Sequence, residues 1–219
     1  MHKTVQNLIT IENEIKSSLS EKNLDKLPKI IAVSKTFSIE NILPLIDHGH
    51  LNFGENKVQE AVDKWTNTKM NFPQIKLHLI GKLQTNKVKF AIKLFDYIHS
   101  VDSEKLALKI AEEENKINKK IKIFIQVNIG EEEQKSGIKK DQLSDFYLYC
   151  KELKLDVVGL MCIPPFEKDP ITYFKEMQNL TNTFEFTELS MGMSSDYLEA
   201  ANYSSTFLRI GSSIFGQRG

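Results

Sequence analysis

Hydrophobic and polar residues alternate along this chain in two different patterns. Residues 3–21 carry Leu8, Ile11, Ile15 and Leu19 at spacings of three, four and four, which predicts one amphipathic helix. Short apolar runs of strand length then recur at residues 29–35, 51–56, 76–81, 97–102, 122–129, 155–163, 185–193 and 206–215. The sequence therefore predicts an N-terminal helix followed by eight strands.

Helical patterns lie between these strands. Apolar residues recur with helical spacing at residues 39–46, 106–111 and 143–150. Asp102 or Ser103 can cap the helix after the fourth strand. Short βα units of this kind are typical of a parallel sheet with right-handed crossovers. An open doubly wound sheet would normally have a glycine-rich segment after its first strand, where this chain has Ser-Lys-Thr at 34–36. We therefore predict an α/β fold: a single (β/α)8 barrel of the TIM type over residues 1–219, with the extra N-terminal helix.

Composition restricts the possible partners and location. The 29 basic and 29 acidic residues balance, and no segment concentrates lysine alone, so we expect no nucleic-acid or anionic-membrane partner. The chain shows neither a signal peptide nor an apolar run long enough to cross a membrane. Cys150 and Cys162 form no CxxC motif, which favours reduced thiols. We expect a cytoplasmic protein that acts as a monomer.

Lys35 is the first candidate for chemistry. It closes the apolar run 29–35 and shares one strand face with Ile31 and Val33. Desolvation at that position would lower the pKa of its ammonium group toward neutrality and make it a nucleophile toward aldehydes. The plainer interpretation is a lysine that extends into water at the rim of the sheet. The residues around Lys35 have to distinguish a reactive lysine from a solvated one.

Two loops supply those surroundings. A barrel of this type has its active face at the C-terminal ends of the strands, and the loops after strands seven and eight often bind phosphate. Here these loops hold glycines and serines, among them Ser194, Gly211 and Ser212, with Met193 next to Ser194. In a closed barrel, Lys35 at the end of strand one lies next to strand eight. A phosphorylated aldehyde satisfies both features, and pyridoxal 5′-phosphate (PLP) is the cofactor with those two groups.

Further polar residues are candidates for the same site. Only two of the 29 basic residues are arginines, and one of them, Arg209, precedes Gly211 on strand eight, where it could donate to the pyridine nitrogen. An arginine partner leaves that nitrogen unprotonated and makes the cofactor a weaker electron sink, so vigorous carbanion chemistry is not expected. Asn56 and Asn86 follow strands two and three and suit the mouth of the barrel. His78, on strand three, either faces the cofactor or fills the core.

Several segments in one order resemble the YggS/PROSC-like pyridoxal phosphate homeostasis proteins. The resemblance lies in AVSKT (32–36), FGEN (53–56), HLIG (78–81), LQTNK (83–87), KSG (135–137), GLM (159–161), SMGMS (190–194) and RIGSSIFG (209–216). It implies a barrel similar to the N-terminal domain of alanine racemase, with PLP held as a Schiff base on Lys35. It further implies no robust turnover, and a role in PLP homeostasis and in PLP supply to apoenzymes. Departures from the family pattern are Leu77 and Leu79 in place of frequent aromatic residues, and Ser212 in place of a frequent threonine.

These considerations define the predicted site and its alternatives. The predicted PLP-binding residues are Lys35, Asn56, His78, Met193, Ser194, Arg209, Gly211 and Ser212. One alternative function is a PLP-dependent amino-acid racemase of low activity, and another is a barrel enzyme that acts on sugar phosphates through a lysine Schiff base. We expect no metal at His48 and His50, because no carboxylate or cysteine cluster completes a ligand set. Cys162 lacks a base nearby in the sequence, so an inert thiol is expected.

Overall fold

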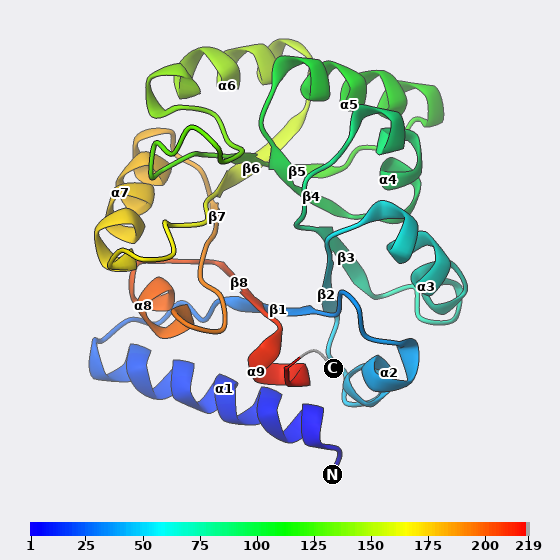
Figure 1. Cartoon of the computed structure of the whole chain (residues 1–219), viewed down its shortest axis with the longest axis vertical. Coiled ribbons are helices and arrows are strands. Elements are labelled where there is room, and N and C mark those ends of the chain that lie inside the picture. Colours follow the sequence, from blue (N-terminus) through cyan, green and yellow to red (C-terminus); the bar gives the residue numbers. More distant parts are fainter. Residues whose placement is uncertain (218–219) are drawn as a thin grey trace.

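Eight parallel strands close into a barrel in the computed structural model, which describes residues 1–217 (Figure 1). Residues 218 and 219, at the end of the predicted domain, lie outside the described residues. The strands pair in chain order and β8 closes on β1. They are β1 (Lys29–Val33), β2 (Asn52–Glu55), β3 (Lys76–Leu79), β4 (Tyr97–Val101), β5 (Lys122–Gln126), β6 (Asp156–Met161), β7 (Glu188–Ser190) and β8 (Phe207–Ile210). The predicted (β/α)8 barrel is confirmed.

Helices surround the barrel and precede it. They are α1 (Lys3–Glu21), α2 (Ile39–Asp47), α3 (Val58–Asn71), α4 (Val88–Leu94), α5 (Glu104–Ile117), α6 (Leu143–Glu152), α7 (Pro170–Thr183), α8 (Tyr197–Asn202) and α9 (Ser212–Phe215), with short 3-10 turns at Thr85–Lys87 and Lys140–Gln142. Ser103 occupies the N-cap of α5, one of the two predicted cap positions. Within residues 1–217, no helix combines the length and the apolar character needed to span a membrane.

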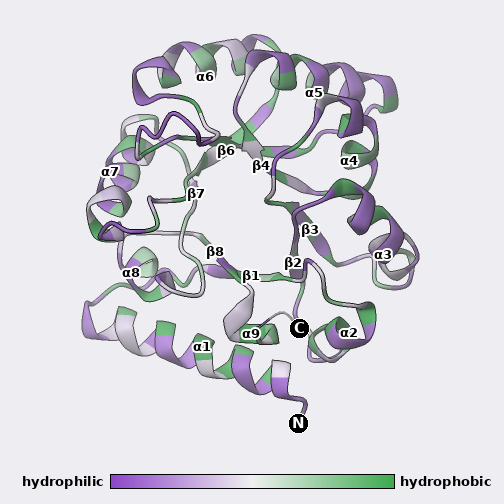
Figure 2. Cartoon of the chain, in the orientation of Figure 1, coloured by the Kyte–Doolittle hydropathy of each residue, from purple (hydrophilic) through white to green (hydrophobic). Residues whose placement is uncertain are grey.

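The N-terminal helix forms as its sequence pattern predicts. The four apolar residues spaced along α1, from Leu8 to Leu19, are all buried, and hydrophobic and polar residues alternate visibly along the helix (Figure 2). α1 packs along α8 and α9 and also contacts α2 (Figure 1). The side-chain amide of Asn7 donates to the Ile214 carbonyl oxygen at 2.8 Å. α1 thus supports the end of the chain that follows β8.

The two faces of each strand bury different residues. Ile31, Phe124, Met161 and Phe207 form an apolar cluster inside the barrel, whereas residues of the opposite strand faces pack under the helices. On β8, for example, Phe207 points inward and Leu208 outward. This alternation directs the odd-numbered residues of β1 and β8 toward the barrel axis.

The predicted strands seven and eight are too long. β7 covers only Glu188–Ser190, and β8 ends at Ile210, because the chain turns after it and forms α9. Ile214 and Phe215 were predicted to lie in a strand, but they belong to α9 and pack outside the sheet. Ile214 is fully buried, and the Phe215 ring stacks on Phe37 with a centroid distance of 4.9 Å. A short apolar run can be buried in either conformation, which is why the pattern gave the wrong element here.

Candidate functional site

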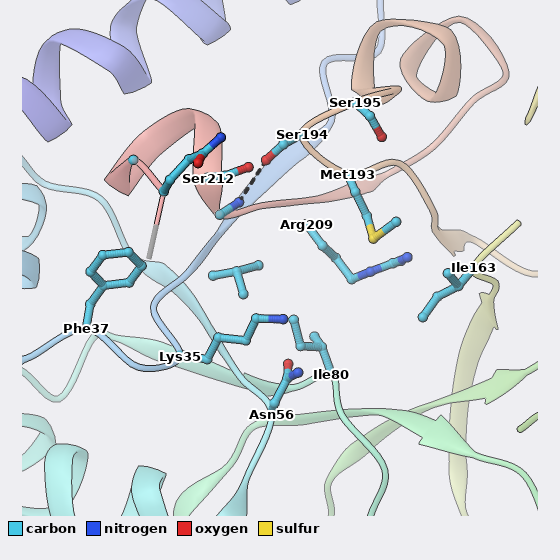
Figure 3. A pocket seen from close by; sticks show the side chains of 14 residues that line it. Lys35, Phe37, Asn56, Ile80, Ile163, Met193, Ser194, Ser195, Arg209 and Ser212 are labelled. Carbon is cyan, nitrogen blue, oxygen red and sulfur yellow. Dashed lines mark hydrogen bonds between the residues drawn. The ribbon is translucent and has the colours of Figure 1, made fainter. Parts of the chain in front are cut away.

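A cavity of about 650 Å³ opens at the C-terminal end of the barrel (Figure 3). Seven of the eight predicted site residues line it, all except His78. They come from the loops that follow four strands, β1, β2, β7 and β8, and from β8 itself. The remaining lining residues are Val33, Phe37, Ile80, Ile163, Ser195, Gly216 and Gln217. Phe37, Ile80 and Ile163 were not predicted, because an apolar residue at a strand end or in a loop carries no chemical signal of its own, and Gln217, a lone polar residue near the end of the chain, was not predicted either.

Lys35 reaches the cavity from a turn. β1 ends at Val33, so the predicted strand is two residues too long, but the predicted face is correct: Ile31 lies inside the barrel and both Val33 and Lys35 line the cavity. Ser34 and Phe37 close the turn, with the Phe37 N–H donating to the Ser34 carbonyl oxygen at 3.2 Å. The Lys35 side chain is half-buried and extends into the cavity beside Asn56 and Ile80 (Figure 3).

Hydrogen bonds within the protein hold the Arg209 side chain in place. Its side chain is buried and projects from β8 into the same cavity as Lys35 (Figure 3). One terminal nitrogen, Nη1, donates to Ser190 Oγ at 2.8 Å, and the other, Nη2, donates to the Cys162 carbonyl oxygen at 2.8 Å. Two hydrogen bonds to different strand ends hold the guanidinium plane in one orientation. The arginine can therefore present a fixed edge to a ligand.

The two predicted anion loops meet at Ser194. Its hydroxyl oxygen accepts from the backbone N–H groups of Gly211 and Ser213, each at 3.3 Å, and Figure 3 shows the bond to Gly211. The loop before it turns at Gly192, where φ is +90° and a Cβ atom would lie 2.5 Å from the Cβ of Ala200. Glycine is needed there because α8 approaches closely. The loops after β7 and β8 thus bring hydroxyls and backbone donors together on one side of the cavity.

His78 does not line this cavity. It is fully buried inside the barrel, where its ring stacks on Tyr97 with centroids 4.4 Å apart. Of the two interpretations of this histidine, the structure supports the one in which it fills the barrel core. The sequence pattern alone could not decide between these two positions. Alternation along a strand shows that a residue faces inward, but not whether it lies in the core or at the mouth of the barrel.

A row of polar groups instead connects His78 to Arg209. His78 Nε2 lies 3.1 Å from Asn52 Oδ1, and His78 Nδ1 lies 3.0 Å from His99 Nε2. His99 Nδ1 then lies 2.9 Å from Ser190 Oγ, the acceptor of Arg209. His99 was not predicted, although its position two residues after Tyr97 places both side chains on one strand face. We name the series Asn52, His78, His99, Ser190 and Arg209 the polar row.

Other residues considered from the sequence lie elsewhere. Asn86 is exposed on a 3-10 turn and does not line the cavity. The described residues contain no group of three histidine, cysteine, aspartate or glutamate side chains that could hold a metal ion. Cys150 and Cys162 are buried free thiols, and burial raises the pKa of each to about 12. Such thiols stay protonated, as expected for Cys162.

Electrostatically, the cavity suits an anion. Lys35 and Arg209 both line it, and the described lining residues include no aspartate or glutamate. No histidine, cysteine or tyrosine accompanies Lys35 among them either. The site therefore combines one amine, one fixed guanidinium group and a set of hydroxyl and backbone donors.

Comparison with known proteins agrees with this geometry. The sequence model of the family "Alanine racemase, N-terminal domain" matches residues 15–219. The pyridoxal phosphate homeostasis protein of Pasteurella multocida is 34% identical over 97% of both chains. The structure of PipY from Synechococcus elongatus with PLP bound is 32% identical, with a TM-score of 0.80 over 92% of this chain and 100% of PipY. An alanine racemase of Clostridium difficile, only 15% identical, shares the fold with a TM-score of 0.75, over 99% of this chain and 57% of that chain. The chain belongs to the alanine racemase N-terminal domain family and, within it, to the pyridoxal phosphate homeostasis proteins.

The pKa values of three histidines, two inside the barrel and one in the loop before β2, predict how stability depends on pH. Desolvation lowers the pKa of His50 from 6.5 to about 4, and it lowers the pKa values of His78 and His99 well below 6.5. Unfolding restores the ordinary pKa of each, so below pH 6.5 the unfolded chain binds more protons than the folded one. The stabilisation is complete above about pH 6.5 and is lost as the pH falls toward 4, by up to roughly 1.4 kcal/mol per pH unit for each histidine.

Urea unfolding at pH 7.5 and pH 5 measures this loss. We expect a lower free energy of unfolding at pH 5, and a smaller loss in His50→Gln than in the unsubstituted protein. His48→Gln, which changes an exposed histidine two residues away, is the matched control and should show nearly the full loss, because desolvation contributes more to the lowered pKa of His50 than the charge of His48 does. Equal losses in the His50→Gln and His48→Gln variants would contradict the assignment.

Proposed function

We propose that this protein binds PLP, holds it as a Schiff base on Lys35 and takes part in intracellular PLP homeostasis and supply to apoenzymes. The observation that carries the proposal is that one cavity contains Lys35, Arg209 and the two serine-containing loops, with no carboxylate among its described lining residues. PipY, a related protein of the same fold, has been solved with PLP bound, which supports the choice of ligand.

The lining residues fit the groups of PLP. The Gly211 and Ser213 N–H groups, which now donate to Ser194 Oγ, can donate to phosphate oxygens, and the Ser212 hydroxyl is available beside them. Arg209 is a donor that cannot readily lose its proton, so it suits an unprotonated ring nitrogen. Lys35 would take the aldehyde. When bound, PLP supplies an aldehyde that condenses with amines and a ring that withdraws electrons.

The same cavity favours holding the cofactor over transforming a substrate. Racemisation needs a proton donor and a proton acceptor on opposite faces of the reacting carbon. Among the described residues that line the cavity, Lys35 is accompanied by no carboxylate, imidazole, thiol or phenol. Arg209 opposite the ring nitrogen further weakens the electron sink. We therefore propose a non-catalytic carrier or regulator, and keep a weak amino-acid racemase as the second candidate because the barrel shares its fold with alanine racemase.

Access to the cavity suits transfer to another protein. Ile163, Ser195 and Ser212 line the cavity and are exposed, so a bound phosphate would stay close to solvent. A protein that transfers its cofactor to another protein needs such access, whereas a closed site would retain the cofactor. We propose PLP-dependent apoenzymes as the recipients, and a monomer acting in the cytoplasm, as expected from the sequence.

Borohydride reduction tests the Schiff base. We expect the protein to turn yellow with PLP, to be bleached by borohydride, and to carry the reduced adduct on Lys35 when mapped by mass spectrometry. Lys35→Ala should abolish the adduct, because the amine is removed. Lys57→Ala, a change at an exposed lysine next to Asn56, is the control and should keep it. A protein that stays colourless with PLP would sink the carrier and the racemase proposals together and favour a sugar-phosphate enzyme.

Proton–deuterium exchange at Cα separates the carrier from the racemase. With PLP bound and a panel of amino acids in D2O, we expect no exchange above that of free PLP, because no second proton-transfer group lines the cavity. Exchange that saturates with amino-acid concentration and vanishes in Lys35→Ala would instead establish the racemase.

Substitution of Ser212 tests the phosphate cradle. Ser212→Ala should weaken PLP retention about three- to tenfold, the usual cost of one lost hydrogen bond, while the borohydride adduct still forms on Lys35. Dialysis of the loaded protein, followed by absorbance, measures retention. Ser213→Ala is the matched control, since it keeps the backbone N–H and Ser213 is not among the cavity-lining residues. Equal retention in both variants would argue against this position of the phosphate.

A further inference from the structure

The turn that carries Lys35 has an unfavourable backbone conformation. Thr36 has a φ of +69°, in the left-handed region, where a β-branched side chain is strained. Glycine or asparagine is the usual residue in such a position. The direction of the Lys35 side chain depends on the turn, because Lys35 immediately precedes Thr36. Something outside the turn has to stabilise this conformation.

Three charged residues under the turn form a cluster. Lys64 Nζ donates to Glu55 Oε1 at 2.9 Å and to Glu60 Oε1 at 3.2 Å. The Glu55 side chain is fully buried, and the side chains of Lys64 and Glu60 are 9% and 28% exposed. Glu55 Oε1 also accepts from the Trp65 indole N–H at 2.9 Å. We call Glu55, Glu60 and Lys64 the turn clamp. None of the three lines the cavity.

The turn clamp binds the residues on both sides of Lys35. Before it, Ser34 Oγ donates to Glu55 Oε1 at 2.8 Å, and Lys64 Nζ donates to the Ser34 carbonyl oxygen at 2.8 Å. After it, the Thr36 N–H donates to Glu60 Oε1 at 2.5 Å. The contact with Glu60 is made directly by the strained residue. The acceptor is an ionised carboxylate, and charge-assisted hydrogen bonds are stronger than neutral ones, so this contact can favour one backbone orientation over another.

We propose that Glu60 and Lys64 are positioning residues for Lys35. Glu60 holds the Thr36 N–H and thereby keeps Thr36 in the left-handed conformation, and Lys64 holds both Ser34 and Glu60. Together they direct the amine of Lys35 into the cavity. The inference rests on the proposed function, because Lys35 is there the residue that takes the aldehyde of PLP. Without Glu60, Thr36 can relax to a negative φ, which turns Lys35 away from its present direction.

A glycine at position 36 distinguishes positioning from a general contribution to stability. Glycine adopts a positive φ without strain, so Thr36→Gly should remove the need for Glu60. We expect Glu60→Ala to form the borohydride-reducible adduct about tenfold more slowly, or worse, because the amine is misplaced. The double variant Glu60→Ala/Thr36→Gly should regain most of the lost rate. A residue that served stability alone would give no such rescue.

The experiment compares adduct formation with thermal unfolding. The rate of absorbance change with PLP and the unfolding midpoint are measured for the unsubstituted protein, Glu60→Ala, Thr36→Gly and the double variant. Glu113→Ala is the matched control: its carboxylate pairs with Lys109 and Lys116 on α5, and the adduct rate should not change. Glu60→Gln keeps an oxygen that can accept from Thr36, so it should lose less rate than Glu60→Ala.

The outcomes separate this inference from the proposed function. If the unsubstituted protein forms no adduct, the proposed function fails and the inference fails with it. If it forms the adduct and Glu60→Ala matches its rate, the inference alone is overturned. A slow Glu60→Ala that Thr36→Gly does not rescue also overturns it. Should Glu60→Ala not fold, Glu60→Gln with and without Thr36→Gly carries the same comparison, and equal rates in that pair would count against the inference.

Discussion

The pairing of β1 with β8 is the contact on which the site depends. Residues 29–32 of β1 lie opposite residues 207–210 of β8, and this ladder turns an open sheet into a barrel. In an open sheet with the same strand order, the first and last strands would lie at opposite edges. Closure makes them neighbours, so the turn after β1 and the loop after β8 open on the same cavity. The amine of Lys35 and the guanidinium group of Arg209 share a site only because the ends of the sheet meet.

The helices next to this closure strengthen the same region. α1 lies outside the repeated βα units, yet it packs on α8, which follows the serine-containing loop after β7, and on α9, whose first two residues are Ser212 and Ser213. Asn7 binds the Ile214 carbonyl oxygen of α9, and the Tyr197 hydroxyl of α8 donates to the carboxylate of Glu14. The loops that suit a phosphate are therefore held from outside the barrel by the N-terminal helix. The first residues of the chain contribute in this way to a site formed mostly by its end.

The sequence predicted what depends on periodicity and on chain order. Alternating strands and helices identified the barrel, and the known position of active sites in such barrels brought Lys35, Arg209 and the serine loops together. The sequence pattern does not reveal depth within the barrel, so His78 was assigned to the site, and its contact with His99 and the contact of His99 with Ser190 were missed. The spacing of Glu60 and Lys64 allows an ion pair on one helix, but only tertiary packing brings that pair against the backbone at Ser34 and Thr36.

The polar row has one consistent arrangement of its hydrogens. Asn52 Oδ1 can only accept, so His78 carries its hydrogen on Nε2, and because burial keeps both rings neutral, its Nδ1 accepts from His99 Nε2–H. His99 Nδ1 then accepts the Ser190 hydroxyl hydrogen, which leaves the lone pairs of that oxygen for Arg209. Every dipole in the row has its negative end toward the guanidinium group. The barrel core thus offsets part of a buried positive charge with oriented uncharged groups, in addition to the carboxylate of Asp196, whose charge also favours the protonated guanidinium group and counteracts the lowering of the Arg209 pKa by burial.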